Sequence, residues 1–218
     1  MSKKAYPSNR ILKEKSKIPA DFKALKLKSM LCGFIAGDGN ITIRKQKNSL
    51  RYDLRFFPDD KIMVDKYLLA LNYLYFKKPK AKFKKSFFEI QLTSRTAVED
   101  LIKIGKFGIN KWTVPFNYLI NDELKVEWLK AFFSAEAYVN KKTIKIQTVN
   151  KNGMYGVSKL LNKFKIEHKC YTYLPKKKNH SQVFIMTINK KESRQLFNIK
   201  IGFYHNKKNQ ILKDSLGL

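Results

Sequence analysis

The chain has 218 residues, enough for one large domain or two compact halves. Its 46 Lys and Arg residues against 17 Asp and Glu residues give a net charge of +29, which indicates a polyanionic partner, with nucleic acid the first candidate. The 16 Phe and 11 Tyr residues exclude a disordered basic chain, and no apolar run is long enough to span a membrane.

The N-terminal part predicts a basic arm and then a helix that ends at an acid. Residues 1–23 form the expected arm, since the stretch is rich in Lys and is broken by Pro7 and Pro19. Asp21 is a favourable N-cap for a helix that runs to Asp38, and a glycine follows where that helix should end.

Two alternating hairpins and two helices complete a first half, at residues 24–106. Tyr52, Leu54 and Phe56 fall on one face of the second strand and polar residues on the other, so one face of the sheet should be core. The expected elements are strands at 41–47 and 51–57 around a turn at 48–50, a helix from the Pro58-Asp59-Asp60 stop to about residue 75, strands at 80–84 and 88–92, and a helix at 94–103.

A linker at residues 107–121, with Gly108 and Pro115, separates this half from a second half at 122–218 that repeats its order. There we expect a helix capped by Asp122, strands at 138–140 and 143–149, a helix at 153–164, strands at 168–174 and 182–189 joined by the basic loop 176–180, and helices at 190–199 and 205–213. The sequence therefore predicts an α+β fold of two pseudo-symmetric αββαββα halves, each with an antiparallel sheet.

Two segments repeat each other. Leu31–Gly39 reads Leu-Cys-Gly-Phe-Ile-Ala-Gly-Asp-Gly, and Leu129–Ala137 reads Leu-Lys-Ala-Phe-Phe-Ser-Ala-Glu-Ala. Both have small residues at the third and seventh places, an aromatic residue at the fourth and an acid at the eighth. Small residues four apart share one helix face, so two such helices can bring their backbones close together.

This packing predicts that the acids Asp38 and Glu136 meet at the C-terminal ends of two touching helices. Helix dipoles and mutual repulsion both disfavour two anions there. A divalent cation such as Mg²⁺, Mn²⁺ or Ca²⁺ removes the conflict, and paired metals catalyse in-line phosphoryl displacement. The alternative is a pair of ordinary core helices that end in solvated acids.

The paired segments resemble the signature of the LAGLIDADG homing endonucleases in their monomeric, two-motif form, although Ala137 stands where that family usually has Gly. The resemblance implies two curved sheets that form a saddle in the major groove of DNA, joined at a two-helix interface. It also implies metal binding by Asp38 and Glu136, helped by the main-chain carbonyls of Gly37 and Ala135. The implied activity is a double-strand break in a long, near-asymmetric target.

The polar faces of the strands should carry the DNA contacts, because Lys and Arg neutralise phosphates while Arg, Gln and Thr read base edges. A solvated outer face is the alternative, and Tyr171 and Tyr173 either stack or extend a second core. The candidate DNA-binding residues are Thr42, Arg44, Gln46, Arg51, Asp53, Arg55, Lys80, Lys82, Lys84, Glu89, Gln91, Thr143, Lys145, Gln147, Lys169, Tyr171 and Tyr173.

The resemblance also implies basic or amide residues around the catalytic water. The place before the second helix, where relatives often have Gln, is Pro58 here, and we match it to Asn150 in the other half. Lys142 and Lys151 are therefore expected as electrostatic helpers, with phosphate contacts or surface lysines as the alternative.

Other classes stay open. An RNA maturase or a cleavage-deficient DNA-binding relative fits the same residues, and a basic structural protein of a ribonucleoprotein fits the charge. Cys32 and Cys170 suit reduced, packing thiols in an intracellular protein, in a prokaryotic cytoplasm or an organelle matrix. The ends of the chain lack splicing junction residues, which favours an intron-encoded enzyme over an intein, and no zinc-ligand spacing is present.

Overall fold

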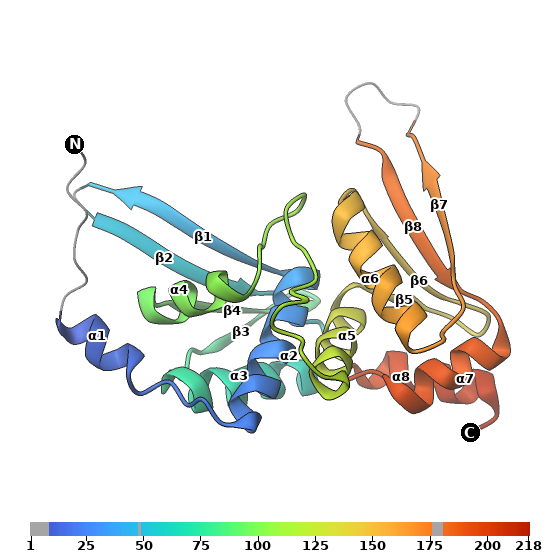
Figure 1. Ribbon diagram of the computed structural model, residues 1–218, viewed down its shortest axis with the longest axis horizontal. Helices are drawn as coiled ribbons and strands as arrows, with labels where there is room; N and C mark the ends of the chain where they lie inside the picture. Colours follow the sequence, from blue (N-terminus) through green and yellow to red (C-terminus); the bar gives the residue numbers. More distant parts are fainter. Residues whose placement is uncertain (1–8, 48, 176–180) are drawn as a thin grey trace.

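The computed structural model describes residues 9–47, 49–175 and 181–218. Two halves stand side by side, each with a four-stranded antiparallel sheet, and the two motif helices lie between them (Figure 1). The predicted fold class is therefore confirmed. No helix in the described ranges is long and apolar enough to cross a membrane.

The first half follows the predicted order, and its strands pair as β1-β2-β4-β3. Tyr52, Leu54 and Phe56 are buried under its helices, as their alternation predicted. The elements are α2 Phe22–Asp38, β1 Gly39–Gln46, β2 Ser49–Phe56, α3 Lys61–Tyr75, β3 Ala81–Lys84, β4 Phe87–Thr93 and α4 Arg95–Ile104.

The second half repeats this order, with strands paired as β5-β6-β8-β7, and adds one helix at its end. The basic loop predicted at 176–180 lies outside the described residues. The elements are α5 Asp122–Glu136, β5 Tyr138–Val139, β6 Ile144–Thr148, α6 Lys151–Lys163, β7 Lys169–Tyr173, β8 Val183–Ile188, α7 Lys191–Lys200 and α8 Asn206–Leu216.

Some predicted boundaries are wrong. The N-cap of α5 is Asn121 rather than Asp122, because the Asn121 side chain accepts from the Leu124 amide at 2.9 Å. Asp122 instead pairs with Lys125 and Lys163. Ser49 and Leu50, predicted as turn, belong to β2; Asn48 lies outside the described residues.

The N-terminal arm contains a short helix, α1, Asn9–Lys15. This helix packs on α4, where Lys15 forms an ion pair with Glu99 at 2.5 Å and the Thr96 hydroxyl donates to Glu14 at 2.9 Å. These contacts anchor the described part of the arm on the first half.

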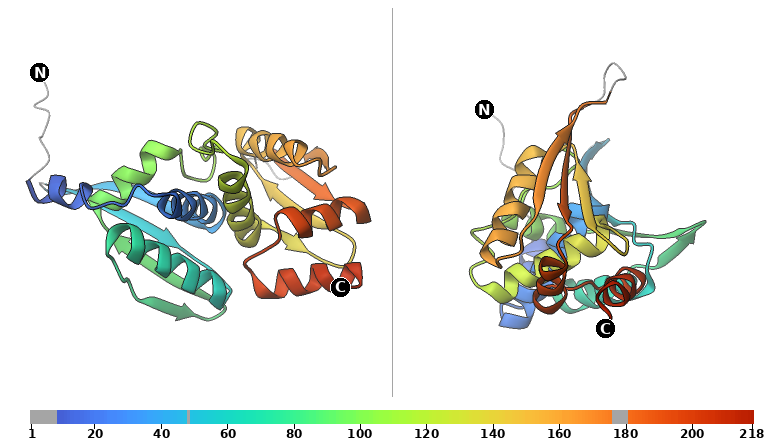
Figure 2. Two further views of the ribbon diagram at one scale, coloured as in Figure 1. Left: turned by 60° about the horizontal axis from the view of Figure 1, so that its bottom comes forward. Right: turned by 90° about the vertical axis from the view of Figure 1, so that its right-hand side faces the viewer.

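The seam between α2 and α5 is as close as the small residues predicted. A Cβ added to Gly33 would lie 2.3 Å from the Trp128 carbonyl oxygen, and one added to Gly37 would lie 2.5 Å from the Ala135 Cβ. Neither position has room for a side chain, so the glycine and alanine stripes set the distance between the halves. The two helices run beside each other between the sheets (Figure 2).

Each half also reaches across to the other through a segment that we call a strap. The first strap, residues 105–121, joins α4 to α5 and packs on α6, where Trp112 covers Gly153 and accepts a hydrogen bond from Asn150 at 2.6 Å. The second strap, residues 201–205, joins α7 to α8 and reaches α3. The backbone amide of Asn206, the residue that follows this strap, donates to the side chain of Asp60, the N-cap of α3, at 3.0 Å.

Candidate active site

The paired acids end their helices, as predicted. Asp38 is the last residue of α2 and Glu136 the last of α5, and both are partly buried. Burial raises the pKa of Asp38 to about 6, and burial together with the charge of Asp38 raises that of Glu136 to about 8. The site therefore holds two carboxylates that resist ionisation together.

A lysine from the far end of the chain lies beside this pair. The Lys208 ammonium, on α8, donates to the main-chain oxygens of Ser134 at 2.7 Å and Ala135 at 3.0 Å. Its charge lowers the pKa of both acids against the effect of burial. No motif pointed to Lys208, and only the fold brings α8 to the end of α5.

Acids and a histidine surround the site on the α3 side. His205 lies between two carboxylates, with Nε2 3.3 Å from Asp59 and Nδ1 3.4 Å from Asp60. The hydrogen bond with His205 keeps the pKa of Asp59 below its ordinary value. Asp59 also disfavours the ionised form of Asp38. The environment of the two catalytic candidates is therefore unequal, because these groups are gathered around Asp38.

The donor set fits a hard divalent cation. Among the described residues no group of three or more His, Cys, Asp and Glu side chains gathers as a metal site. Two carboxylates and neighbouring carbonyls remain, and this is the ligand type that Mg²⁺ takes when water and phosphate oxygens complete its shell. The repulsion between the two acids is what a bound cation would relieve.

The side-chain amide of Asn150 does not face the acid pair, because both of its polar atoms are hydrogen-bonded elsewhere. Its side chain accepts from the Gly153 amide at 3.1 Å and donates to the Trp112 carbonyl at 2.6 Å, so it caps α6 and holds the first strap. The N-cap of α3 is Asp60, and Asp60 rather than Pro58 is thus its counterpart.

Lys142 and Lys151 are exposed, at a turn before β6 and at the start of α6. The groups that act on the two acids include Lys208, Asp59 and His205 but neither of these lysines. Their helper role stays a prediction, and the geometry favours Lys208 over both.

The first sheet gathers its polar side chains on one face. The register places Arg44 opposite Arg51, Arg55 opposite Gln91, and Lys82 opposite Glu89. The candidates Thr42, Gln46, Asp53 and Lys84 share that face through alternation. Lys80, predicted in the strand, precedes β3 and lines the same hollow as Arg51, Lys82 and Glu89.

Asp53 has a role that alternation alone did not show. Its side chain is fully buried, and it accepts hydrogen bonds from Arg44, Arg51, Gln91 and Thr93 at 2.6 to 3.2 Å. Burial raises the pKa of Asp53, but these hydrogen bonds outweigh it and hold the pKa well below its ordinary value. Asp53 is therefore a fixed anion that orients two arginines.

The second sheet presents a less charged face. Lys145, Gln147, Lys169 and the two tyrosines share it, and Tyr171 and Tyr173 are 49% and 54% exposed, so they do not extend a second core. The predicted contact Thr143 precedes β6, and its hydroxyl donates to Asn189 at 2.6 Å. Cys32 is buried as predicted, but Cys170, expected to pack, is exposed on β7.

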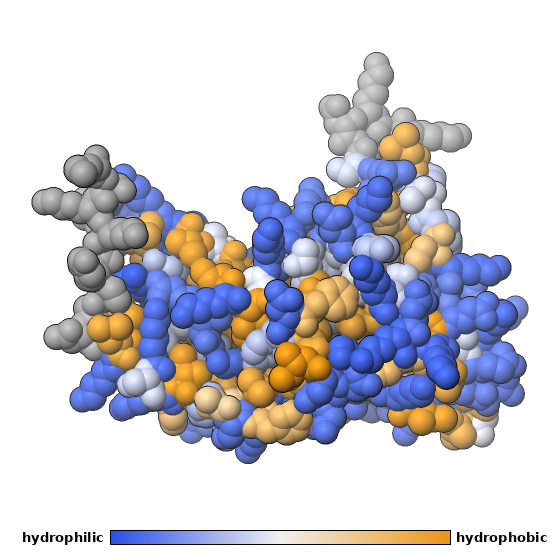
Figure 3. Space-filling model, in the orientation of Figure 1, coloured by the Kyte–Doolittle hydropathy of each residue, from blue (hydrophilic) through white to orange (hydrophobic). Residues whose placement is uncertain are grey.

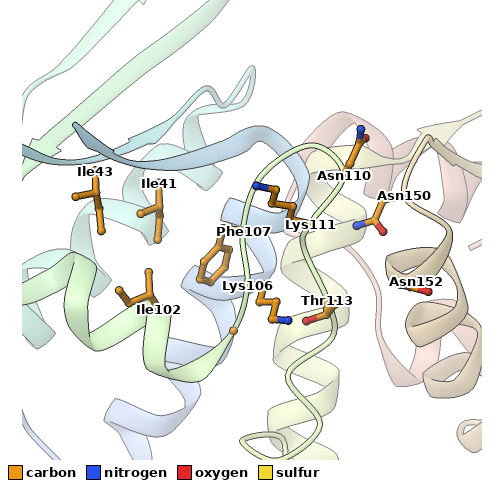
Figure 4. A pocket seen from close by; sticks show the side chains of 11 residues that line it. Ile41, Ile43, Ile102, Lys106, Phe107, Asn110, Lys111, Thr113, Asn150 and Asn152 are labelled. Atoms are coloured by element: carbon orange, nitrogen blue, oxygen red, sulfur yellow. The ribbon is translucent and has the colours of Figure 1, made fainter. Parts of the chain in front are cut away.

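Hydrophilic side chains cover much of the face in Figure 3, and hydrophobic ones gather in its middle, between the halves. A pocket of about 630 Å³ lies there, between Ile41 and Ile43 of β1, Ile102 of α4 and the first strap (Figure 4). No acid lines it, so its place is distinct from the acid pair.

Comparison with known proteins supports the fold and the motif. Residues 123–202 match the model of a LAGLIDADG-like domain. The structure of I-DmoI in complex with DNA and Ca has a TM-score of 0.63 and 17% identity, and the match covers 81% of this chain and 90% of that one. The N-terminal LAGLIDADG domain of DUF199/WhiA has a TM-score of 0.57 and 15% identity, covering 88% and 90%. No curated protein matches the chain.

Residues 123–202 therefore match a LAGLIDADG-like domain, as the paired motifs indicated, and the likeness to the solved structures shows the two-half fold over most of the chain. The fold is similar to that of the homing endonuclease I-DmoI, a variant structure of which matches with a TM-score of 0.64 at 16% identity, over 81% of this chain and 91% of that one.

Proposed function

We propose that the protein is a site-specific, metal-dependent endonuclease, encoded by an intron, that makes a double-strand break in a long DNA target. The observation that carries this proposal is the acid pair Asp38 and Glu136. Each acid belongs to one half, both resist ionisation, and they lie at the ends of two helices held at backbone contact. The helix dipole and the neighbouring acid both disfavour a negative charge at these positions, so a purely structural role does not explain the two carboxylates.

The two carboxylates would hold the divalent cation, Mg²⁺ or in its place Mn²⁺ or Ca²⁺, with the carbonyls of Gly37 and Ala135. The cation supplies a polarised phosphate and an activated water. The acids are held near each other because α2 and α5 are in backbone contact at the Gly33 seam. The similar protein I-DmoI has been solved with DNA and Ca and with DNA and Mn, which supports this choice of ions.

The polar sheet faces would hold the DNA. Asp53 fixes the forks of Arg44 and Arg51, and a guanidinium held in one orientation matches the two acceptors of a guanine. Lysines such as Lys82 would contact phosphates. The two faces differ in composition, so the halves would read different sequences and the target would be near-asymmetric. One chain supplies both acids, which fits a monomer.

A cleavage-deficient DNA-binding protein or an RNA maturase is the second candidate, because Ala137 replaces the usual Gly of the second motif. The backbone at Ala137 is extended, with φ −77° and ψ 137°. An alanine adopts this conformation without strain, since only positive φ favours Gly. The replacement therefore does not weaken the first proposal.

The test is incubation with a library of long DNA duplexes, with and without Mg²⁺, followed by sequencing of the ends. We expect discrete cleavage sites only with Mg²⁺. Asp38→Asn and Glu136→Gln should abolish the double-strand break and keep specific binding, whereas Asp65→Asn, at an exposed acid of α3, should cut normally. Specific binding by the wild-type chain without any Mg²⁺-dependent break would favour the second candidate.

A further inference from the structure

The ammonium of Lys208 lies where the proposed metal site needs a free oxygen. It donates to the Ala135 carbonyl at 3.0 Å and to the Ser134 carbonyl at 2.7 Å, at the last turn of α5. The Ala135 carbonyl is one of the four metal ligands proposed above. A cationic group of the protein and a metal ion would therefore compete for the same oxygen.

The position of Lys208 is set by the fold and not by a mobile side chain alone. Lys208 lies in the first turn of α8, and the side chain of His205 caps this turn by accepting from the Lys208 backbone amide at 3.4 Å. The start of α8 is also attached to the first half, because the backbone amide of Asn206 donates to Asp60 at 3.0 Å. The Lys208 side chain thus starts from a fixed point between the halves.

The charges around Lys208 come from every element that meets there. Asp38 ends α2, Glu136 ends α5, and Asp59 and Asp60 precede α3; all four attract the ammonium. Lys208 in turn favours the ionised forms of Asp38 and Glu136. Within the described residues, Lys208 is the cation whose charge lowers the pKa of both Asp38 and Glu136.

We propose that Lys208 is a built-in counter-ion of the acid pair that competes with the metal: without metal its ammonium occupies the Ala135 carbonyl, and a divalent cation takes that carbonyl from it. This inference rests on the proposed metal site. A carbonyl oxygen has two lone pairs, but two cations beside one oxygen repel each other. The ammonium must therefore move away from the carbonyl, or the metal binds more weakly.

Removing the charge of Lys208 should then have two opposite effects. The acid pair loses its counter-ion, so the metal-free protein becomes less stable. The carbonyl becomes free and a repulsive charge disappears, so the affinity for a divalent cation rises. A lysine that only caps the C-terminal end of α5 would stabilise the protein equally with and without metal.

The experiment uses Ca²⁺ as the probe, by isothermal titration calorimetry on the full chain, for the wild type, Lys208→Met and the control Lys207→Met, an exposed lysine one residue earlier. We expect Lys208→Met to bind Ca²⁺ about tenfold more tightly than the wild type, equivalent to ~1.4 kcal/mol. The control should bind as the wild type does. Equal Ca²⁺ affinity in the wild type and Lys208→Met would overturn the inference and leave the endonuclease proposal standing.

Thermal melting supplies the second readout. In EDTA, Lys208→Met should melt below the wild type, and saturating Ca²⁺ should raise its melting temperature by more than it raises that of the wild type. An equal loss with and without Ca²⁺ would identify a simple helix cap. Lys208→Gln, which keeps a donor for the carbonyls but has no charge, replaces the methionine variant if the latter does not fold. Absence of Ca²⁺ binding in the wild type and in every variant would also refute the inference. The endonuclease proposal would then be tested separately, by the Mg²⁺-dependent cleavage assay.

Discussion

Replacing Gly33 by alanine should lower the stability of the protein by pushing α2 and α5 apart, although alanine is the better helix former. The added Cβ would lie 2.3 Å from the Trp128 carbonyl oxygen and 2.9 Å from the Ala131 Cβ, where ordinary contact begins at 3.4 Å. The nearest obstacle is backbone, which cannot rotate away, so α2 and α5 must move apart by about 1 Å. Overpacking of this kind costs ~1–3 kcal/mol, more than the ~1 kcal/mol that alanine gains over glycine in a helix.

The assay is urea unfolding of the wild type and Gly33→Ala, followed by tryptophan fluorescence, because Trp128 lies on the seam. We expect a lower midpoint for Gly33→Ala. Asn162→Ala, at an exposed position of α6, is the control for helix propensity and should stay within about 0.5 kcal/mol of the wild type. A Gly33→Ala protein as stable as the wild type, or more stable, would show that the helices do not touch at this position.

Three more outcomes follow from the site. Because the pKa values of Asp38 and Glu136 are raised to about 6 and about 8, the stability that their protonated forms contribute is lost as the pH rises through these values. The melting temperature in EDTA should therefore decline between about pH 5 and about pH 9, where acids with lowered pKa values such as Asp53 stay ionised, and Glu136→Gln, which cannot ionise, should flatten the upper part of this decline. An unchanged profile for that variant would contradict the assignment. Lys82→Ala should flatten the slope of log affinity against log salt by about one unit on any duplex, whereas Arg55→Ala should cost ~1–3 kcal/mol on the cleaved site alone, as measured by binding to target and scrambled DNA over a range of salt. Asp53→Asn should destabilise the first sheet by ~1–3 kcal/mol in urea unfolding, since it removes a buried anion that several donors share, and wild-type stability would mean that the network is incidental.

Local signals were sufficient to predict most of the architecture. Alternation of Tyr52, Leu54 and Phe56 predicted a half-buried strand, and the caps Asp21 and Asp60 marked helix starts, because both features depend on neighbouring residues only. The seam between α2 and α5 was also predictable, since small residues four apart on a helix mainly serve to bring two helices into close contact.

Features that depend on contacts distant in sequence were not predictable. Nothing near Lys208 distinguishes it from the other 45 Lys and Arg residues, and its role follows only from the place of α8. Asp53 alternates as a surface residue does, yet donors from three strands enclose it. Cys170 was expected to pack because a cysteine in a strand is usually buried, but every residue of β7 is exposed.

The two straps have a consequence for how the molecule comes apart. Each half lends a segment to the other, with Trp112 on the second half and Asn206 on the first. A cut between the first strap and α5 would not yield two independent modules, because each fragment would keep the strap that packs on the other half and would lack the strap that packs on itself. The halves should accordingly melt in one cooperative transition, and a single half produced alone should fold only when its complement is supplied. The chain repeats one unit twice, but its smallest folding unit is the whole.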